Sequence, residues 1–417
     1  MTPAAAVGDR SVVGLHPLLV RPDDDDPQYI VAGRPEIGEF AEMPALCGEI
    51  IRLLGDGLTV AAVEEEIARR HGVGVGVAGV VDTMREMGFV ASIDGQPLPD
   101  PAQGAPRPHL GSLSRTSVSW LFSRPVVLLW WAIVAAAVLT LLTRPDVFPG
   151  YEDFFWNEHV GFVVLVNTAM FSVVVTVHEL MHLFAARSLD APARISFGTR
   201  LHHLVMQTDV TAIWGVPRRA RYRVYLAGMA WDVLLIAALV LLLAHAPPPE
   251  PVAALLRALM LAVLLSVALQ AHVYMRSDLY FVLRDLLRCR NLFDQGLAYA
   301  RYLLARAVSA VRGRGRPADP STVLPPHERR ATRLYSVFLA GGAGVALAMY
   351  AFYGVPIVVS SLVRAVTALA AGFQGGPLLT AVDAAMFLLV EGGLQLLYVV
   401  TFLRSHRHWF RRPARTG

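Results

Sequence analysis

VGFVVLVNTAMFSVVVTVHELMHLFAAR, residues 160–187, is the stretch from which the fold and chemistry of this chain are inferred. Its first eighteen residues are apolar almost throughout. At about 1.5 Å rise per residue, a helix of this length can cross a hydrocarbon core of roughly 30 Å. We therefore predict a membrane-spanning helix that carries polar residues near its C-terminal end.

These polar residues form the motif His178-Glu179-Leu180-Met181-His182. Two histidines four residues apart project from one face of a helix, so their neutral ring nitrogens can share one zinc ion. Glu179 beside them can act as general base on the metal-bound water. Ionisable side chains inside an apolar span are costly and usually line a functional cavity. The alternative is that the pair sits at the helix end and reaches headgroup water.

The composition of the whole chain is that of a polytopic membrane protein. Of its 417 residues, 55% are hydrophobic, and every basic residue is an arginine. The mean hydropathy is +0.48, and the apolar residues fall into long, separate runs. We predict a mainly α-helical fold with about six transmembrane helices. The expected helices cover residues 125–143, 160–187, 222–244, 252–276, 335–363 and 378–403.

Arginines are distributed unevenly among the loops between these helices. Seven lie in the loop after the second helix, eleven in the loop after the fourth, and five from Arg404 onward. The alternate loops are mainly acidic. Because positively charged loops stay on the inner side, we expect a multi-pass protein of a bacterial cell membrane with both termini in the cytoplasm.

The chain before the first expected span divides into three parts. Residues 1–27 end in the acidic run Asp23–Asp26 and are expected to form a disordered lead-in. Residues 28–94 show short strand and helix patterns that predict a small α+β domain of the winged-helix type. Residues 95–124 are expected to be a Pro/Gly-rich linker followed by an interfacial segment. The transmembrane domain would then cover residues 125–417.

Charge excludes nucleic-acid binding as the function of residues 28–94. This region has 11 acidic side chains against 5 arginines, and a surface of that sign repels phosphate. Its helix pattern and the turn GDGLT at residues 55–59 resemble the PqqD-like domains, which recognise leader peptides of ribosomally made, modified peptides. The resemblance implies a leader peptide that adds as a strand to a sheet edge. The alternative is a structural or dimerising domain.

A zinc ion held by two histidines and a water lacks one protein ligand. The helix expected at 252–276 runs from outside to inside, as the helix at 160–187 does, and Asp278 follows its end. Asp278 therefore matches His178 and His182 in depth. We expect its carboxylate to be the third ligand.

Three segments together resemble a known family: HELMH at 178–182, QTDVTAIW at 207–214 and RSDLY at 276–280. They are similar to motifs of the site-2 protease type of intramembrane zinc metallopeptidase, especially its bacterial peptide zinc metalloprotease branch. The likeness covers about residues 160–304.

The resemblance implies that His178, His182 and Asp278 bind Zn²⁺ and that Glu179 is the catalytic base. It implies a zinc metalloendopeptidase that hydrolyses a peptide bond of a membrane-associated or leader-bearing peptide at the cytoplasmic membrane face. Its partners would be that peptide or membrane-protein substrate and the lipid bilayer.

The third motif departs from the family pattern in two places. The family usually has Asn-Pro six residues before the ligand aspartate and a glycine directly after it, whereas this chain has His272-Val273 and Leu279. Loss of the proline removes a helix break, and loss of the glycine removes backbone freedom beside the ligand. Two alternatives to a regular site follow: the carboxylate of Asp278 is aimed differently, or His272 joins the site.

Residues 195–211 mix β-branched residues with glycine and are expected to form a short hairpin at the cytoplasmic face. An extended substrate would pair with its edge, while the front domain raises the local substrate concentration through a flexible linker. Asp232 and Glu391, two further intramembrane carboxylates, are expected to pair with a neighbouring helix or to line the cavity. The rival function is that of a non-proteolytic membrane receptor or assembly protein for a ribosomally made modified peptide pathway.

Overall fold

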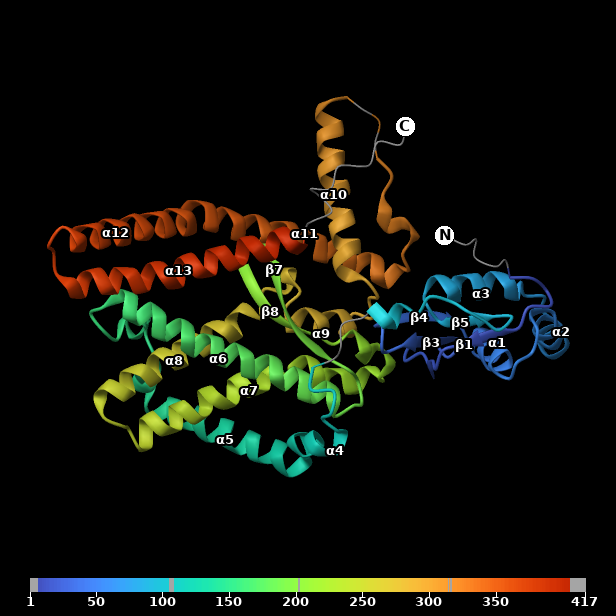
Figure 1. Cartoon of the computed structure of the whole chain (residues 1–417), viewed down its shortest axis with the longest axis horizontal. Helices are drawn as coiled ribbons and strands as arrows, with labels where there is room; N and C mark the ends of the chain where they lie inside the picture. Colours follow the sequence, from blue (N-terminus) through green and yellow to red (C-terminus); the bar gives the residue numbers. More distant parts are fainter. Residues whose placement is uncertain (1–6, 105–108, 202, 314, 316, 406–417) are drawn as a thin grey trace. The chain divides into compact units, whose positions relative to one another are not determined.

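The computed structural model describes residues 7–104, 109–201, 203–313, 315 and 317–405 (Figure 1). The chain is mostly helical, with three small sheets. It separates into two compact units. The first comprises the residues up to 120 together with 183–194 and 209–224, and the second comprises the rest.

The first unit contains two three-stranded antiparallel sheets, three helices that follow or separate their strands, and the one-turn helix α4 (Arg115–Val118). One sheet has the strand order β2-β3-β4 and the other the order β1-β5-β6. The elements are β1 (Val13–Leu15), β2 (Leu19–Pro22), β3 (Tyr29–Arg34), β4 (Glu39–Pro44), α1 (Ala45–Gly55), α2 (Val60–His71), α3 (Val77–Glu86), β5 (Val90–Ile93) and β6 (Gln96–Pro97).

The three helices enclose the core of this unit. Each helix has one apolar face, and Ile50, Ile67 and Met84, from α1, α2 and α3, are fully buried. Thr59 caps α2, because its hydroxyl accepts a hydrogen bond from the backbone N–H of Ala62 at 3.3 Å. The α+β composition expected for residues 28–94 is therefore present.

The expectation of a disordered lead-in at residues 1–27 is wrong for residues 13–22, which form β1 and β2. β2 pairs with β3 along its whole length, and β1 pairs with β5, where Val13 is only 1% exposed. Both strands are short, and the partner of β1 lies far along the chain, so the local pattern does not reveal them. The acidic run Asp23–Asp26 forms the turn between β2 and β3.

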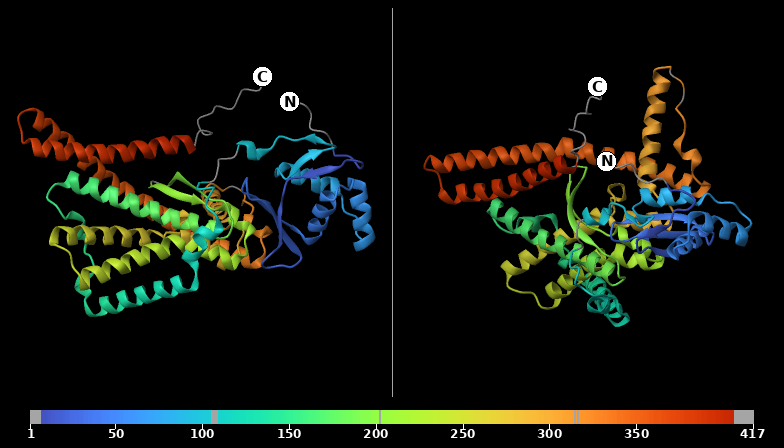
Figure 2. Two further views of the ribbon diagram at one scale, coloured as in Figure 1. Left: turned by 60° about the horizontal axis from the view of Figure 1, so that its bottom comes forward. Right: turned by 45° about the vertical axis from the view of Figure 1, so that its right-hand side comes forward.

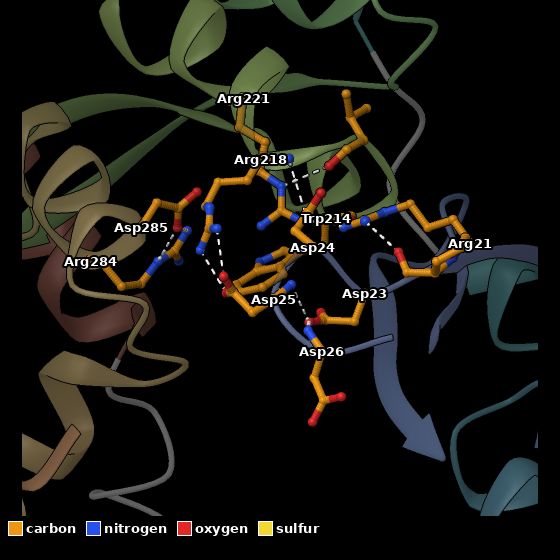
Figure 3. Close-up of polar contacts among 12 residues, drawn as sticks. Arg21, Asp23, Asp24, Asp25, Asp26, Trp214, Arg218, Arg221, Arg284 and Asp285 are labelled. Carbon is orange, nitrogen blue, oxygen red and sulfur yellow. Dashed lines mark hydrogen bonds and ion pairs between the residues drawn. The ribbon is translucent and has the colours of Figure 1, made fainter. Parts of the chain in front are cut away.

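This acidic turn binds the start of α7 (Arg218–His245), within the first unit (Figure 3). Both carboxylate oxygens of Asp25 accept hydrogen bonds from the guanidinium of Arg218 at 2.6 Å. A carboxylate oxygen of Asp24 accepts one from the backbone N–H of Arg218 at 3.1 Å and lies 3.4 Å from Nη2 of Arg221. The acidic turn thus acts as an N-cap for a helix nearly two hundred residues away in sequence.

The second unit contains the apolar helices (Figures 1 and 2). In the described part of the chain, six helical stretches are long and apolar enough to cross a membrane. Four neighbouring helices, α5 to α8, lie side by side, and α12 and α13 form an antiparallel pair. The bounds are α5 (Arg124–Thr143), α6 (Val160–Arg187), α8 (Glu250–Leu269), α11 (Pro326–Met349), α12 (Val355–Phe373) and α13 (Leu378–Ser405).

The expected spans agree with these helices except at the fourth and fifth. The fifth is longer than 335–363. α11 and α12 are joined by a π-helical turn at Tyr350–Gly354 and form one helical stretch from Pro326 to Phe373. The fourth ends at Leu269 instead of residue 276. After it come a bend and two further helices, α9 (Asp278–Leu286) and α10 (Leu292–Val311).

The hairpin expected at residues 195–211 is present as β7 (Arg194–Arg200) and β8 (His203–Asp209). The two strands pair only with each other among the described strands. Each therefore has one edge that is not bonded to another strand.

Candidate metal centre

Three donor atoms converge in the second unit. Nε2 of His178 and Nε2 of His182 lie 3.1 Å apart. Oδ2 of Asp278 lies 3.1 Å from each of these nitrogens. Among the described residues, His178, His182 and Asp278 are the one group of three or more His, Cys, Asp or Glu side chains whose donor atoms lie close enough together to hold a metal ion.

The two histidines come from the last third of α6, where the i, i+4 spacing places both rings on one face. Their ring centroids are 4.8 Å apart. Both residues are buried, with exposed fractions of 4% for His178 and 5% for His182. The pair is therefore withdrawn from solvent, which contradicts the alternative that it reaches out from the end of the helix.

Gly228 of α7 makes room for the pair. A Cβ at this position would lie 2.3 Å from Nε2 of His178 and 2.5 Å from Nε2 of His182. Any side chain here would fill the space beside the two donor nitrogens. The space beside the donors is thus kept open by the absence of a side chain on α7.

Asp278 reaches the centre through a bend between α8 and α9. Arg276 has a left-handed backbone, with φ of 58°, which turns the chain back before α9 begins. The carbonyl of Gln270 accepts a hydrogen bond from the hydroxyl of Ser277 at 2.7 Å. The side-chain oxygen of Gln270 accepts one from the backbone N–H of Asp278 at 3.0 Å. These bonds fix the first residue of α9, and with it the aspartate carboxylate.

The structure contains neither of the two alternatives raised by the departures in the third motif. The carboxylate of Asp278 points to both histidines although the chain lacks the proline and glycine of the family pattern. His272 does not join the group: its Nδ1 lies 3.1 Å from the carbonyl oxygen of Leu269, and its ring packs edge-on against Tyr274. The break between α8 and α9 contains the left-handed backbone of Arg276 and the hydrogen bonds of Gln270. The sequence alone did not indicate a structural role for either residue.

Glu179 is held beside the centre by the hairpin. The hydroxyl of Thr208 on β8 lies 2.6 Å from Oε2 of Glu179 and 3.0 Å from its backbone carbonyl oxygen. Glu179 is 8% exposed. A buried carboxylate beside the donor cluster has the place expected of a general base.

A further charged residue of the hairpin, Arg200, was not identified from the sequence. Its guanidinium donates a hydrogen bond to the side chain of Gln207 at 3.1 Å. Burial lowers the pKa of Arg200, and the carboxylates of Asp278 and Glu179 oppose that shift. The hairpin therefore brings a positive charge into the electrostatic field of the donor cluster.

Asp232 and Glu391 have different surroundings. Oδ2 of Asp232 lies 2.9 Å from Nδ1 of His178, so this carboxylate borders the centre. Glu391 pairs with Gln395 one turn further along α13, at 2.9 Å. The expected pairing with a neighbouring helix is thus present for Asp232, whose partner lies on α6, whereas Glu391 is paired within its own helix.

The donor set fits a zinc ion. In a tetrahedral site with bonds of about 2.0–2.1 Å, neighbouring ligand atoms lie about 3.3–3.4 Å apart. The three atoms here are 3.1 Å from one another, so a shift of a few tenths of an ångström would admit the ion. Two imidazoles and one carboxylate also match the ligand preferences of zinc and leave a fourth position for water.

Comparisons with protein-family models, with curated proteins and with solved structures found no match to this chain.

Proposed function

We propose that this chain is an intramembrane zinc-dependent endopeptidase. The observation that carries the proposal is the convergence of His178, His182 and Asp278 at 3.1 Å beside the buried carboxylate of Glu179. Three protein ligands and an open fourth position are characteristic of hydrolytic zinc sites. The placement of the motif within an apolar helix supports a site at membrane depth.

Each residue has a defined role in this proposal. His178, His182 and Asp278 would hold the zinc ion, which when bound lowers the pKa of a water ligand and polarises the peptide carbonyl. Glu179 accepts the proton of the attacking water and returns it to the leaving amine. Thr208 holds the Glu179 carboxylate in place for both transfers.

The substrate we propose is a membrane-associated or leader-bearing peptide. The free edges of β7 and β8 favour an extended chain, because strand addition holds a peptide by its backbone and lines up one bond with the metal. The α+β domain of the first unit would bind a leader peptide in the same manner. We place the protein in a bacterial cell membrane with both termini in the cytoplasm, on the basis of the arginine-rich loops.

The experiment uses the full chain in lipid nanodiscs with a mixed pool of single-span apolar peptides that carry short cytoplasmic tails. Cleavage is detected by mass spectrometry, and bound zinc is measured by elemental analysis. We expect the wild type to bind one zinc ion per chain and to cleave members of the pool. Glu179→Gln should bind the same amount of zinc and cleave none of them.

Two outcomes would contradict the proposal. Cleavage by Glu179→Gln at the wild-type rate would show that the carboxylate is not the base. Zinc binding without any cleavage by the wild type, combined with retention of leader peptides, would favour the receptor or assembly function instead.

A further inference from the structure

Asp232 is a fully buried carboxylate in the middle of an apolar helix. It is 0% exposed, and its neighbours along α7 are mainly aliphatic. Removing a carboxylate from water without full compensation costs roughly several kcal/mol. A side chain of this kind persists where it has a partner or a function.

The partner of Asp232 is a histidine of the donor cluster. Oδ2 of Asp232 lies 2.9 Å from Nδ1 of His178, while the other ring nitrogen, Nε2, faces His182 and Asp278. An imidazole that presents a lone pair on Nε2 carries its proton on Nδ1. A carboxylate 2.9 Å from Nδ1 accepts a hydrogen bond from this N–H and thereby favours the tautomer with the proton on Nδ1.

Asp232 also connects three helices. Its Oδ2 accepts a hydrogen bond from the hydroxyl of Ser266 on α8 at 3.4 Å, so α6, α7 and α8 meet at one oxygen atom. Its Oδ1 is buried and has no hydrogen-bond partner within the described residues. The hydrogen bonds around it therefore compensate only part of the buried charge, and a cation in the donor cluster would compensate more.

The position of Asp232 on α7 links it to the site a second time. Gly228 lies four residues earlier on the same helix face and keeps the space beside the two donor nitrogens open. One face of α7 thus carries both Gly228, which leaves space beside the two Nε2 atoms, and Asp232, whose carboxylate lies at Nδ1 of His178.

We infer that Asp232 is a positioning residue for the metal centre: its carboxylate fixes the tautomer and the ring orientation of His178 and raises the basicity of Nε2. This inference rests on the proposed zinc site and adds a residue that contacts a zinc ligand without binding the metal itself. Carboxylates in this position typically change metal affinity by roughly 10- to 100-fold. A residue that only packs three helices together would leave the ligand field of the metal unchanged.

The test compares Asp232→Asn and Asp232→Glu in the full chain, reconstituted in nanodiscs. Asp232→Asn keeps the shape but presents an amide that no longer selects one tautomer, whereas Asp232→Glu keeps the negative acceptor. The control is Glu391→Gln, which neutralises another intramembrane carboxylate whose partner lies in its own helix. Zinc affinity is measured by competition with a chromophoric chelator, and the ligand field by the visible absorption of the Co²⁺-substituted protein.

We expect Asp232→Asn to weaken zinc binding by roughly 10- to 100-fold and to shift the Co²⁺ absorption bands. Asp232→Glu should restore part of the affinity, and Glu391→Gln should leave affinity and spectrum as in the wild type. Wild-type affinity and an unshifted spectrum in Asp232→Asn would overturn the inference while leaving the proposed function standing. Absence of zinc binding by the wild type would instead overturn the proposed function.

Discussion

The hydroxyl of Thr208 on β8 lies 2.6 Å from a carboxylate oxygen of Glu179 on α6, and 3.0 Å from the backbone carbonyl oxygen of the same residue. One side chain thereby holds both the backbone and the carboxylate of the proposed base. β8 and α6 are thus joined at the residue on which the proposed proton transfer depends.

Replacing Thr208 tests this link. Thr208→Val removes the hydroxyl while keeping the β-branched shape, so the Glu179 carboxylate loses its restraint. General-base catalysis is typically worth 10²- to 10⁴-fold, and an enzyme with a misaligned base should retain roughly one tenth to one hundredth of the rate. We expect kcat to fall to that fraction of the wild-type value, with zinc content unchanged. Thr208→Ser, which keeps the hydroxyl, should retain most of the activity; equal activity in both variants would contradict the role.

The zinc-motif helix could be predicted from sequence because its signal is local. Apolar length predicts residues 160–187 as a span, and the structure has α6 with those bounds. The i, i+4 spacing then places His178 and His182 on one face. Topology and charge alone placed Asp278 at the same depth, and its carboxylate lies beside both rings.

What the sequence did not reveal depends on partners distant in the chain. β1 becomes a strand because it pairs with β5, and the turn after β2 binds Arg218 at the start of α7. The bend between α8 and α9 contains a glutamine side chain that accepts a backbone hydrogen bond and an arginine with a left-handed backbone, and no proline or glycine in the sequence indicates it. The sequence predicts Asp232 as an intramembrane carboxylate, but its pairing with His178 depends on how α6 packs against α7.

Gly228 offers a test of the space beside the donor atoms. In Gly228→Ala the new Cβ would lie 2.3 Å from Nε2 of His178, so a ring or the helix must shift. Zinc content per chain, measured by elemental analysis, should fall well below that of the wild type. The matched control is Gly344→Ala in α11, where nothing lies within 4 Å of the added atom; zinc content should not change there. Full zinc occupancy in Gly228→Ala would show that the centre tolerates the added methyl group.

The contact between Asp25 and Arg218 predicts a specific pattern of rescue. Charge reversal in Asp25→Arg or Arg218→Asp places like charges together, and the double variant restores opposite charges. The side chains are 35% and 20% exposed, so solvent screening keeps the coupling energy at about 0.5–1 kcal/mol. Thermal unfolding of the first unit should show lower stability in each single variant and recovery in the double variant, with smaller differences in 1 M salt. Additive losses in the double variant would mean that the two residues do not interact.

We predict that Gln270 orients Asp278, the proposed third ligand, although Gln270 is not itself a ligand. Its side-chain oxygen accepts the hydrogen bond from the backbone N–H of Asp278, and Gln270→Ala leaves that N–H to water. The carboxylate should then explore more orientations, and zinc affinity should fall by less than in Asp278→Ala, which removes a ligand outright. Gln374→Ala, at the exposed end of α12, is the control and should bind zinc as the wild type does. Chelator competition ranks the four proteins. Wild-type affinity in Gln270→Ala would mean that the left-handed backbone at Arg276 suffices to aim the aspartate.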